Sequence, residues 1–118
     1  MNLEQFLSKI KQGERVAFTE TMAIIDQNFD YQPTGFSNGS EENKHINEAG
    51  SNEGSCKIFA FAQQQQLTAE QTLALFGDYY WTDVLAHPEE NNHANIRAFM
   101  REGWQGINFF GKALTPKP

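Results

Sequence analysis

The sequence predicts a mainly helical α+β domain, with about five helices and a small two-stranded β ribbon. Three observations lead to this prediction. The 118 residues, taken as one unit over 1–118, match the usual size of a single compact domain. Apolar side chains recur at spacings of three and four along five stretches, as they do on one face of a helix. One short stretch bounded by glycines is rich in β-branched and aromatic residues, which is typical of a strand.

Two helices are predicted near the N-terminus. Phe6 and Ile10 belong to the apolar face of the first helix. Asn2 can cap its start, and Gly13 can supply the left-handed residue that ends it. The second helix is predicted at about 19–28, with its own apolar stripe.

A polar segment follows. Pro33 ends helical structure, because it lacks an N–H group and restricts the preceding residue to extended geometry. From 37 to 55 only two residues are apolar, so a long polar loop is predicted over 37–50. A loop of that length in a small domain is usually functional or disordered. The last residues, 115–118, are predicted to form a short tail.

Two more helices come next. The third, over about 51–66, has apolar residues on several faces and is predicted to be central. Thr68 and Gln71 form a capping box at the start of the fourth helix. Gly77 is a point where that helix can kink or split, and His87 marks its end.

The fifth helix and the strand complete the domain. Asn92 can cap a helix over 94–102, and Gly103 ends it. The strand predicted at 107–110 needs a partner, and 34–37 is the best candidate for the second strand of the ribbon.

Charge and composition exclude several classes of protein. Nine Lys and Arg residues against 15 Asp and Glu give a net charge of −6, which argues against a nucleic-acid binder. A single cysteine cannot form an internal disulfide. No apolar run is long enough to span a membrane, and the first residues do not resemble a signal peptide. The histidines lack zinc-ligand spacing, so neither a metal nor a cofactor is predicted.

Cys56 and His93 are the candidates for catalysis. Cys56 lies in the first turn of a predicted helix, where the helix dipole favours a thiolate. A nucleophilic cysteine needs an imidazole within reach, and His93 could be oriented by Asn92 or by a nearby carboxylate. The alternative is that Cys56 packs in the core, as free cysteines commonly do.

Two surface features are candidates for binding. His93, Arg97 and Arg101 form one cationic edge of the fifth helix, suited to an anionic ligand or an acidic partner. The alternative is that these groups pair with the chain's own carboxylates. Tyr79 and Trp81 belong to a run of three aromatics that cannot all face one core, so at least one lies near the surface.

Several segments, spread over nearly the whole chain, share one family pattern. They are Tyr31–Thr34, Asn47–Lys57, Phe59–Ala62, Gln71–Gly77, Asn95–Met100, Gly103–Trp104 and Gly111 with Ala113–Pro116. Together they resemble the HopJ type III effector family. The sequence departs from the pattern in two places, since the loop Ser40–His45 is longer and Trp81 is an extra residue in the fourth helix.

The resemblance implies a bacterial protein but brings no catalytic residues with it. The family is named for an effector delivered through a type III secretion apparatus. The N-terminus here, with Glu4 in a well-patterned helix, lacks the Ser-rich and acid-poor character of such secretion signals. We therefore expect a protein of the bacterial cytoplasm. The family name implies, in addition, export of the protein through a type III system.

Two functions remain open from the sequence. One is a protein-interaction module without catalysis, whose partner is an unidentified protein or a small anionic ligand rather than nucleic acid or a membrane. The other is a thiol-dependent hydrolase or transferase with Cys56 as nucleophile and His93 as base. The residues expected to bind the partner are Asn52, Glu53, Tyr79, Trp81, Arg97, Arg101 and Trp104.

Overall fold

The computed structural model describes all 118 residues. The helices are α1 (Leu3–Lys11), α2 (Phe18–Asn28), α3 (Glu53–Gln64), α4 (Ala69–Ala74) and α5 (Ala94–Glu102), with a π-helical segment η1 (Tyr79–Val84) and a 3-10 turn η2 (Gly103–Gly106). The strands are β1 (Phe29–Tyr31), β2 (Phe36–Asn38), β3 (His45–Asn47), β4 (Asn108–Phe109) and β5 (Leu114–Pro116). The predicted mainly helical α+β class is confirmed.

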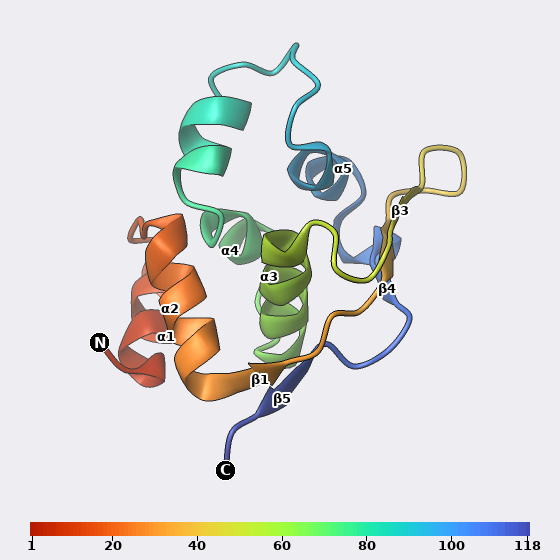
Figure 1. Ribbon diagram of the computed structural model, residues 1–118. Helices are drawn as coiled ribbons and strands as arrows, with labels where there is room; N and C mark the ends of the chain where they lie inside the picture. Colours follow the sequence, from red (N-terminus) through yellow and green to blue (C-terminus); the bar gives the residue numbers. More distant parts are fainter.

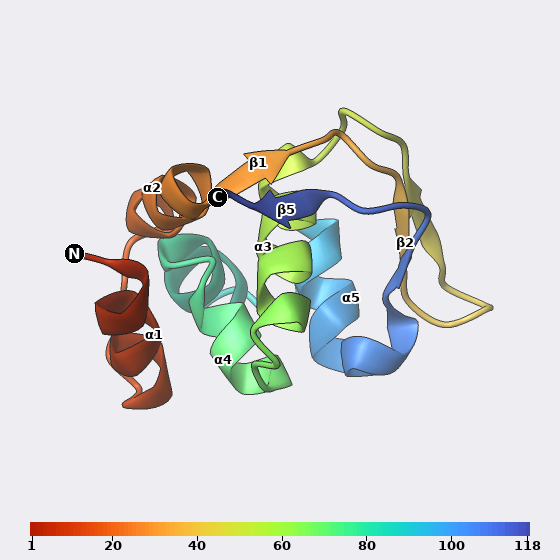
Figure 2. The ribbon, with the colours of Figure 1, turned by 90° about the horizontal axis from the view of Figure 1, so that it is seen from below.

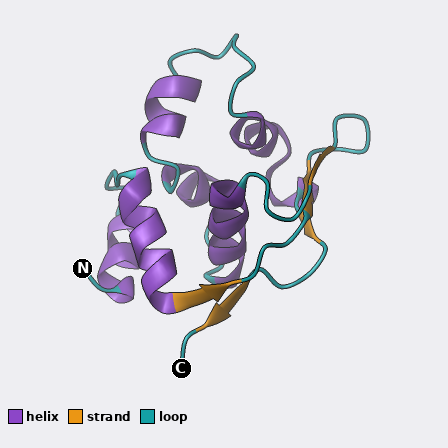
Figure 3. Ribbon diagram, viewed as in Figure 1, coloured by secondary structure: helices purple, strands orange, loops and turns teal.

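Helix α3 runs through the middle of the domain, with α1 and α2 on one side and α5 on the other (Figure 1; Figure 2). Helix α4 contacts α1, α3 and α5. The strands form two separate sheets, as Figure 3 shows: the antiparallel pair β1–β5 contacts α3, and the antiparallel sheet β3–β2–β4 contacts α5 through β2. None of the helices combines the length and the apolar character that crossing a membrane requires.

The central position predicted for the third helix is confirmed by its burial. Its buried residues are Cys56, Ile58, Phe59, Ala60, Phe61 and Ala62. The Phe59 ring lies 5.0 Å from that of Phe99 and 5.6 Å from that of Phe76, measured between centroids. Burying aromatic side chains of this size removes 150–250 Å² each from water, so α3 organises the core.

The helix starts show why local sequence predicts them well. Asn2 accepts a hydrogen bond from the Gln5 amide at 2.8 Å and its own amide donates to the Gln5 side chain at 2.9 Å. Thr68 and Gln71 make the same reciprocal pair, so the predicted capping box is confirmed. Such pairs satisfy amides that have no acceptor inside the helix.

The helix predicted from Thr68 to His87 is split, and its second half is wider than an α-helix. Gly77 takes a left-handed φ of +62° between α4 and η1, and a Cβ there would lie 2.6 Å from the Phe18 nitrogen. Glycine is therefore required at this break. In η1 the Leu85 amide donates to the Tyr80 carbonyl, five residues back, so the turn holds one residue more than an α-helical turn.

The polar loop predicted over 37–50 contains a β-hairpin. The predicted ribbon pairing of 34–37 with 107–110 is confirmed, with Phe36 opposite Phe109, but β3 joins the other edge of β2 and makes three strands. The predicted tail 115–118 also differs, because β5 pairs with β1 and its ladder is extended by the Lys117 amide, which donates to the Asn28 carbonyl at 3.0 Å. Distant partners stabilise these short strands, so local patterns do not reveal them.

Candidate functional site: the α3–α5 cleft

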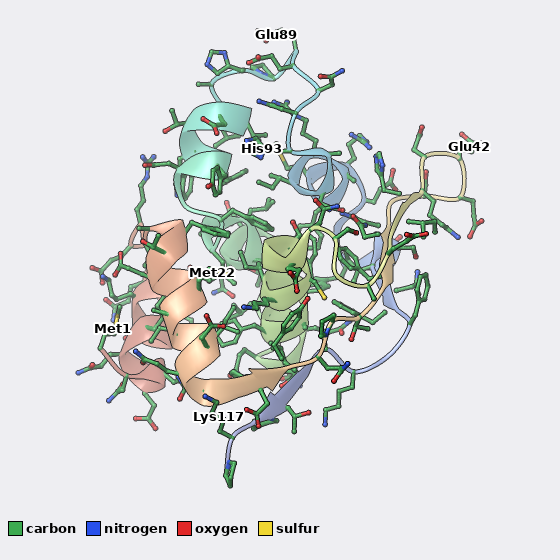
Figure 4. The ribbon with its side chains drawn as sticks, viewed as in Figure 1. Met1, Met22, Glu42, Glu89, His93 and Lys117 are labelled. Carbon is green, nitrogen blue, oxygen red and sulfur yellow. The ribbon has the colours of Figure 1, made fainter.

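A cleft of about 570 Å³ lies where the N-terminal ends of α3 and α5 meet strand β3. Its lining residues are Phe18, His45, Ile46, Asn47, Asn52, Gly54, Ser55, Phe76, Tyr79, His93, Ala94, Asn95 and Ile96. In the view of Figure 4, His93 at the start of α5 lies above the N-terminal end of α3. The volume falls within the range of about 300–1,000 Å³ that is typical of ligand sites. We call this site the α3–α5 cleft.

A network of asparagine side chains forms the back of the cleft. Asn38, Asn47 and Asn95 are buried, and Asn52 joins them from the surface. The Asn47 Oδ1 accepts from Asn52 Nδ2 at 2.7 Å and from Asn95 Nδ2 at 2.9 Å. Asn38 Nδ2 donates to Asn95 Oδ1 at 3.0 Å and to the Asn95 carbonyl at 2.9 Å. Buried amides are costly unless they are hydrogen-bonded, and those of Asn47 and Asn95 are, whereas Asn38 Oδ1 has no partner. The bonds of Asn47 and Asn95 fix the β2–β3 hairpin against both helix starts.

Both helices that open on the cleft begin in the same unusual way. The N-cap residues Asn52 and His93 have left-handed φ values of 49° and 52°, and neither side chain caps its helix. The first intrahelical bonds are made by the amides of Cys56 and Arg97, so the amides that precede them have no acceptor in the helix. Two sets of hydrogen-bond donors therefore meet at the cleft.

His93 is held on both sides by the π-helical segment. Its Nε2 lies 3.1 Å from Asp83 Oδ2, and its ring centroid lies 5.2 Å from that of Tyr79. Phe18 continues this aromatic wall, with its ring 5.0 Å from Tyr79. Because the carboxylate accepts from Nε2, the other ring nitrogen of a neutral His93 is left as an acceptor. A carboxylate does orient His93, but it is Asp83 rather than a group next to it in sequence.

Cys56 has the surroundings of a core residue. It is 1% exposed, does not line the cleft, and its Sγ donates to the Thr34 carbonyl at 3.4 Å. Burial raises the pKa of the Cys56 thiol, which keeps it protonated and unreactive at neutral pH. His93 lines the cleft, so the structure does not bring Cys56 and His93 together there.

The remaining candidate residues fall into three places. Asn52 and Tyr79 line the cleft, and Glu53 is exposed beside it at the first position of α3. Trp81 lies under the Arg15 guanidinium, 4.3 Å from ring centroid to Cζ. Trp104 supports the core, since its Nε1 donates to the Leu67 carbonyl at 3.1 Å.

The two arginines of α5 lie outside the cleft. Arg97 Nε donates to the Asn92 carbonyl at 2.6 Å, and its Nη2 donates to Asn92 Oδ1 at 2.8 Å. Asn92 was predicted as the N-cap of this helix, but the N-cap is His93, and Asn92 instead binds Arg97. Arg101 is exposed on the next turn.

Sequence reasoning missed several residues of the cleft. They are Phe18, His45, Ile46, Asn47, Ser55 and Asn95. Asp83, which does not line the cleft but holds His93, was missed as well. Asn47 and Asn95 carried a signal, because each begins a segment of the family pattern. Asp83 carried none, because its approach to His93 depends on the π-helical geometry of η1. No three of the His, Cys, Asp and Glu side chains lie close enough together to hold a metal ion.

Comparisons with known proteins agree with the sequence motifs. A family model described as HopJ type III effector protein matches residues 3–114. Among solved structures, the crystal structure of a protein of unknown function, VPA0580, is similar: the two are 49% identical, with a TM-score of 0.93, over 99% of this chain and 95% of that chain. No curated protein matches the chain significantly.

Proposed function

The chain belongs to the HopJ type III effector protein family, and from that premise we propose that it is a binding module without catalysis that recognises its partner in the α3–α5 cleft. One observation carries the proposal. Two helix N-termini with uncapped amides open on a single cleft whose back is held by buried asparagines. Concave sites with a few fixed polar groups are the usual place of ligand recognition.

The lining indicates what the partner offers. The first-turn amides of α3 and α5 are donors, so they suit carbonyl or carboxylate oxygens. Ile46 and Tyr79 line the cleft with 60% and 43% of their surfaces exposed, which is high for large apolar residues in this chain. A polypeptide segment that presents carbonyl oxygens inward and an apolar side chain to Ile46 and Tyr79 satisfies both features.

The asparagine network supports binding because it keeps the cleft open before the partner arrives. Asn47 and Asn95 are 4% and 7% exposed, and they bond to each other twice, at 2.9 and 3.2 Å. A site held in its binding conformation loses little conformational entropy on association.

The proposal is tested by filling the cleft. Peptides selected from a displayed random library on the wild-type protein are assayed against Ser55→Trp, which places an indole in the cleft, and against Gln63→Trp, an exposed site on the same helix. We expect Ser55→Trp to weaken binding about tenfold or more, and Gln63→Trp to leave it unchanged. Peptides that bind Ser55→Trp as well as wild type would show that recognition lies elsewhere.

The thiol-dependent alternative has less support. His93 has the oriented imidazole that such an enzyme needs, with Asp83 at 3.1 Å. The nucleophile is missing from the cleft, because Cys56 is 1% exposed and its pKa is raised by burial.

The proposed place of action is the bacterial cytoplasm. The family description, type III effector protein, suggests export through a type III system as a further step. The fold bears on that step because α1 is part of the core, with Phe6 and Ile10 buried. An N-terminal signal in this segment would be accessible only after α1 detaches from the domain.

A further inference from the structure

We propose that a second surface, the groove along α5, binds an acidic and apolar segment of a partner protein. The groove is distinct from the α3–α5 cleft and shares no residue with it. It has a volume of about 280 Å³ and lies between α5 and the segment that follows η1. Figure 4 marks Glu89 at the tip of that segment, which arches away from the body of the domain.

The floor of the α5 groove is apolar and exposed. Leu85 and Met100 line it with 42% and 43% of their surfaces exposed, and Val84 and Pro88 lie beside them. Most large apolar side chains of this chain are buried, so two exposed ones facing one groove mark a contact surface.

The rim of the groove carries two arginines that form no ion pair with a carboxylate. No carboxylate lies within 4.0 Å of the guanidinium of Arg97 or Arg101. The alternative that the cationic edge pairs with the chain's own carboxylates therefore holds for His93, whose Nε2 lies 3.1 Å from Asp83 Oδ2, but for neither arginine. Glu90 also lines the groove, but its carboxylate lies 3.3 Å from His87 Nδ1.

The arginines differ in the donors they have left. Arg97 uses three N–H groups to hold the groove wall, donating to the carbonyl and side chain of Asn92 and to the Pro88 carbonyl at 3.4 Å. Arg101 makes no hydrogen bond through its side chain, so all five of its donors are free for a carboxylate. Arg97 thus shapes the groove and Arg101 offers the main contact.

These features together define the occupant. A bound segment must bring apolar side chains for Leu85 and Met100 and carboxylates for Arg101. Charge complementarity favours such a partner, because the groove is lined by two guanidiniums that have no carboxylate partner. A nucleic acid would match the arginines but not the apolar floor, so the floor favours a polypeptide.

The test uses a defined probe. A fluorescein-labelled amphipathic peptide, with leucines on one face and glutamates on the other, is titrated by fluorescence polarisation. We expect it to bind the wild-type protein and to bind Arg101→Glu at least about tenfold more weakly. Met100→Ser should also weaken binding, and added salt should weaken it further.

Matched controls separate the groove from general charge effects. Lys112→Glu makes the same change of charge at an exposed lysine outside the groove, and it should leave binding unchanged. Ser55→Trp should also leave it unchanged, because that residue belongs to the cleft. The proposal is overturned if the probe does not bind, if Lys112→Glu weakens binding equally, or if a probe with serines in place of leucines binds as well. Self-association of the wild type that Arg101→Glu abolishes would also overturn it, in favour of a second copy as occupant.

Discussion

Asn47 connects more parts of the cleft than any other side chain of the asparagine network. It accepts two hydrogen bonds through Oδ1, and its Nδ2 donates to Asn95 Oδ1 at 3.2 Å and to the Phe36 carbonyl at 3.4 Å. These partners belong to β2 and to the starts of α3 and α5, so one residue at the end of β3 ties three elements together.

Asn47→Ala should destabilise the domain by about 2–4 kcal/mol, because it leaves the buried Nδ2 of Asn95 without its acceptor and the Phe36 carbonyl without the Asn47 donor. Urea denaturation measures this change. Asn43→Ala, at an exposed residue of the same hairpin, is the control and should cost less than about 0.5 kcal/mol. Equal effects of the two substitutions would mean that the network adds no stability.

Single residues of the cleft were predictable to different degrees. His93 and Tyr79 could be singled out because histidine and exposed aromatics are recognisable as types, and both line the cleft. Cys56 was singled out as a thiol, and its burial agrees with the alternative prediction that it packs in the core. Asp83 could not be paired with His93 from a spacing of ten residues, because the pairing depends on the chain's path between η1 and α5.

At the scale of elements, the break between α4 and η1 depends on one glycine. Gly77→Ala should lower the free energy of unfolding by at least about 3 kcal/mol. The substitution adds backbone strain at φ +62°, and the new Cβ would lie 2.6 Å from the Phe18 nitrogen of α2. Gly50→Ala is the matched control, since its φ is +88° but nothing lies within 4 Å of a new Cβ. That control should cost only about 1 kcal/mol. Thermal unfolding of both variants checks the difference, and similar losses would show that the contact with α2 can relax.

Helices and strands differed in how far the sequence predicted them. The starts of α1 and α4 depend on side chains within four residues, so the Asn2 cap and the Thr68–Gln71 capping box could be predicted. The β1–β5 pair joins Tyr31 to Leu114 across most of the chain, and neither three-residue strand shows a period of its own. The π-helical form of η1 was not predicted from the run of aromatics around Trp81.

At the scale of the whole molecule, stability should fall in alkaline solution. Burial raises the pKa of Cys56, of Tyr31 and of Tyr80, and Glu53 adds to the shift of Tyr31. A group whose pKa is higher in the folded state stabilises the fold fully below its unfolded pKa and loses that contribution as the pH rises. The loss should begin near pH 8.5 for the thiol and near pH 10 for the phenols.

Urea denaturation at pH values from 7 to 11 measures this fall. Cys56→Ala removes the thiol, so its stability should decline less than that of the wild type between about pH 8 and pH 10. Parallel curves for the two proteins in that interval would contradict a raised thiol pKa.

Both proposed surfaces use helix α5. Its N-terminal turn contributes Ala94, Asn95 and Ile96 to the α3–α5 cleft, and its later turns contribute Arg97, Met100 and Arg101 to the groove. The sequence predicted a binding role for this helix from its cationic edge, but not a division into two sites. That division depends on the paths of β3 and of the segment after η1, which are set by tertiary contacts.

The asparagine network also bears on the chemical lifetime of the protein. Asn38 precedes Gly39, a pair in which the side-chain amide is readily lost when the following backbone nitrogen attacks it. In the folded domain that nitrogen donates to the Gly106 carbonyl at 3.0 Å, and Asn38 Nδ2 is held by Asn95. Deamidation therefore requires prior opening of this region. The product is irreversible, and it would place a carboxylate against the carbonyl and Oδ1 oxygens of Asn95, which now accept from Asn38 Nδ2. Each opening of the β2–β3 hairpin therefore exposes Asn38 to irreversible deamidation. The packing that holds this hairpin in place thus also slows chemical degradation of the protein.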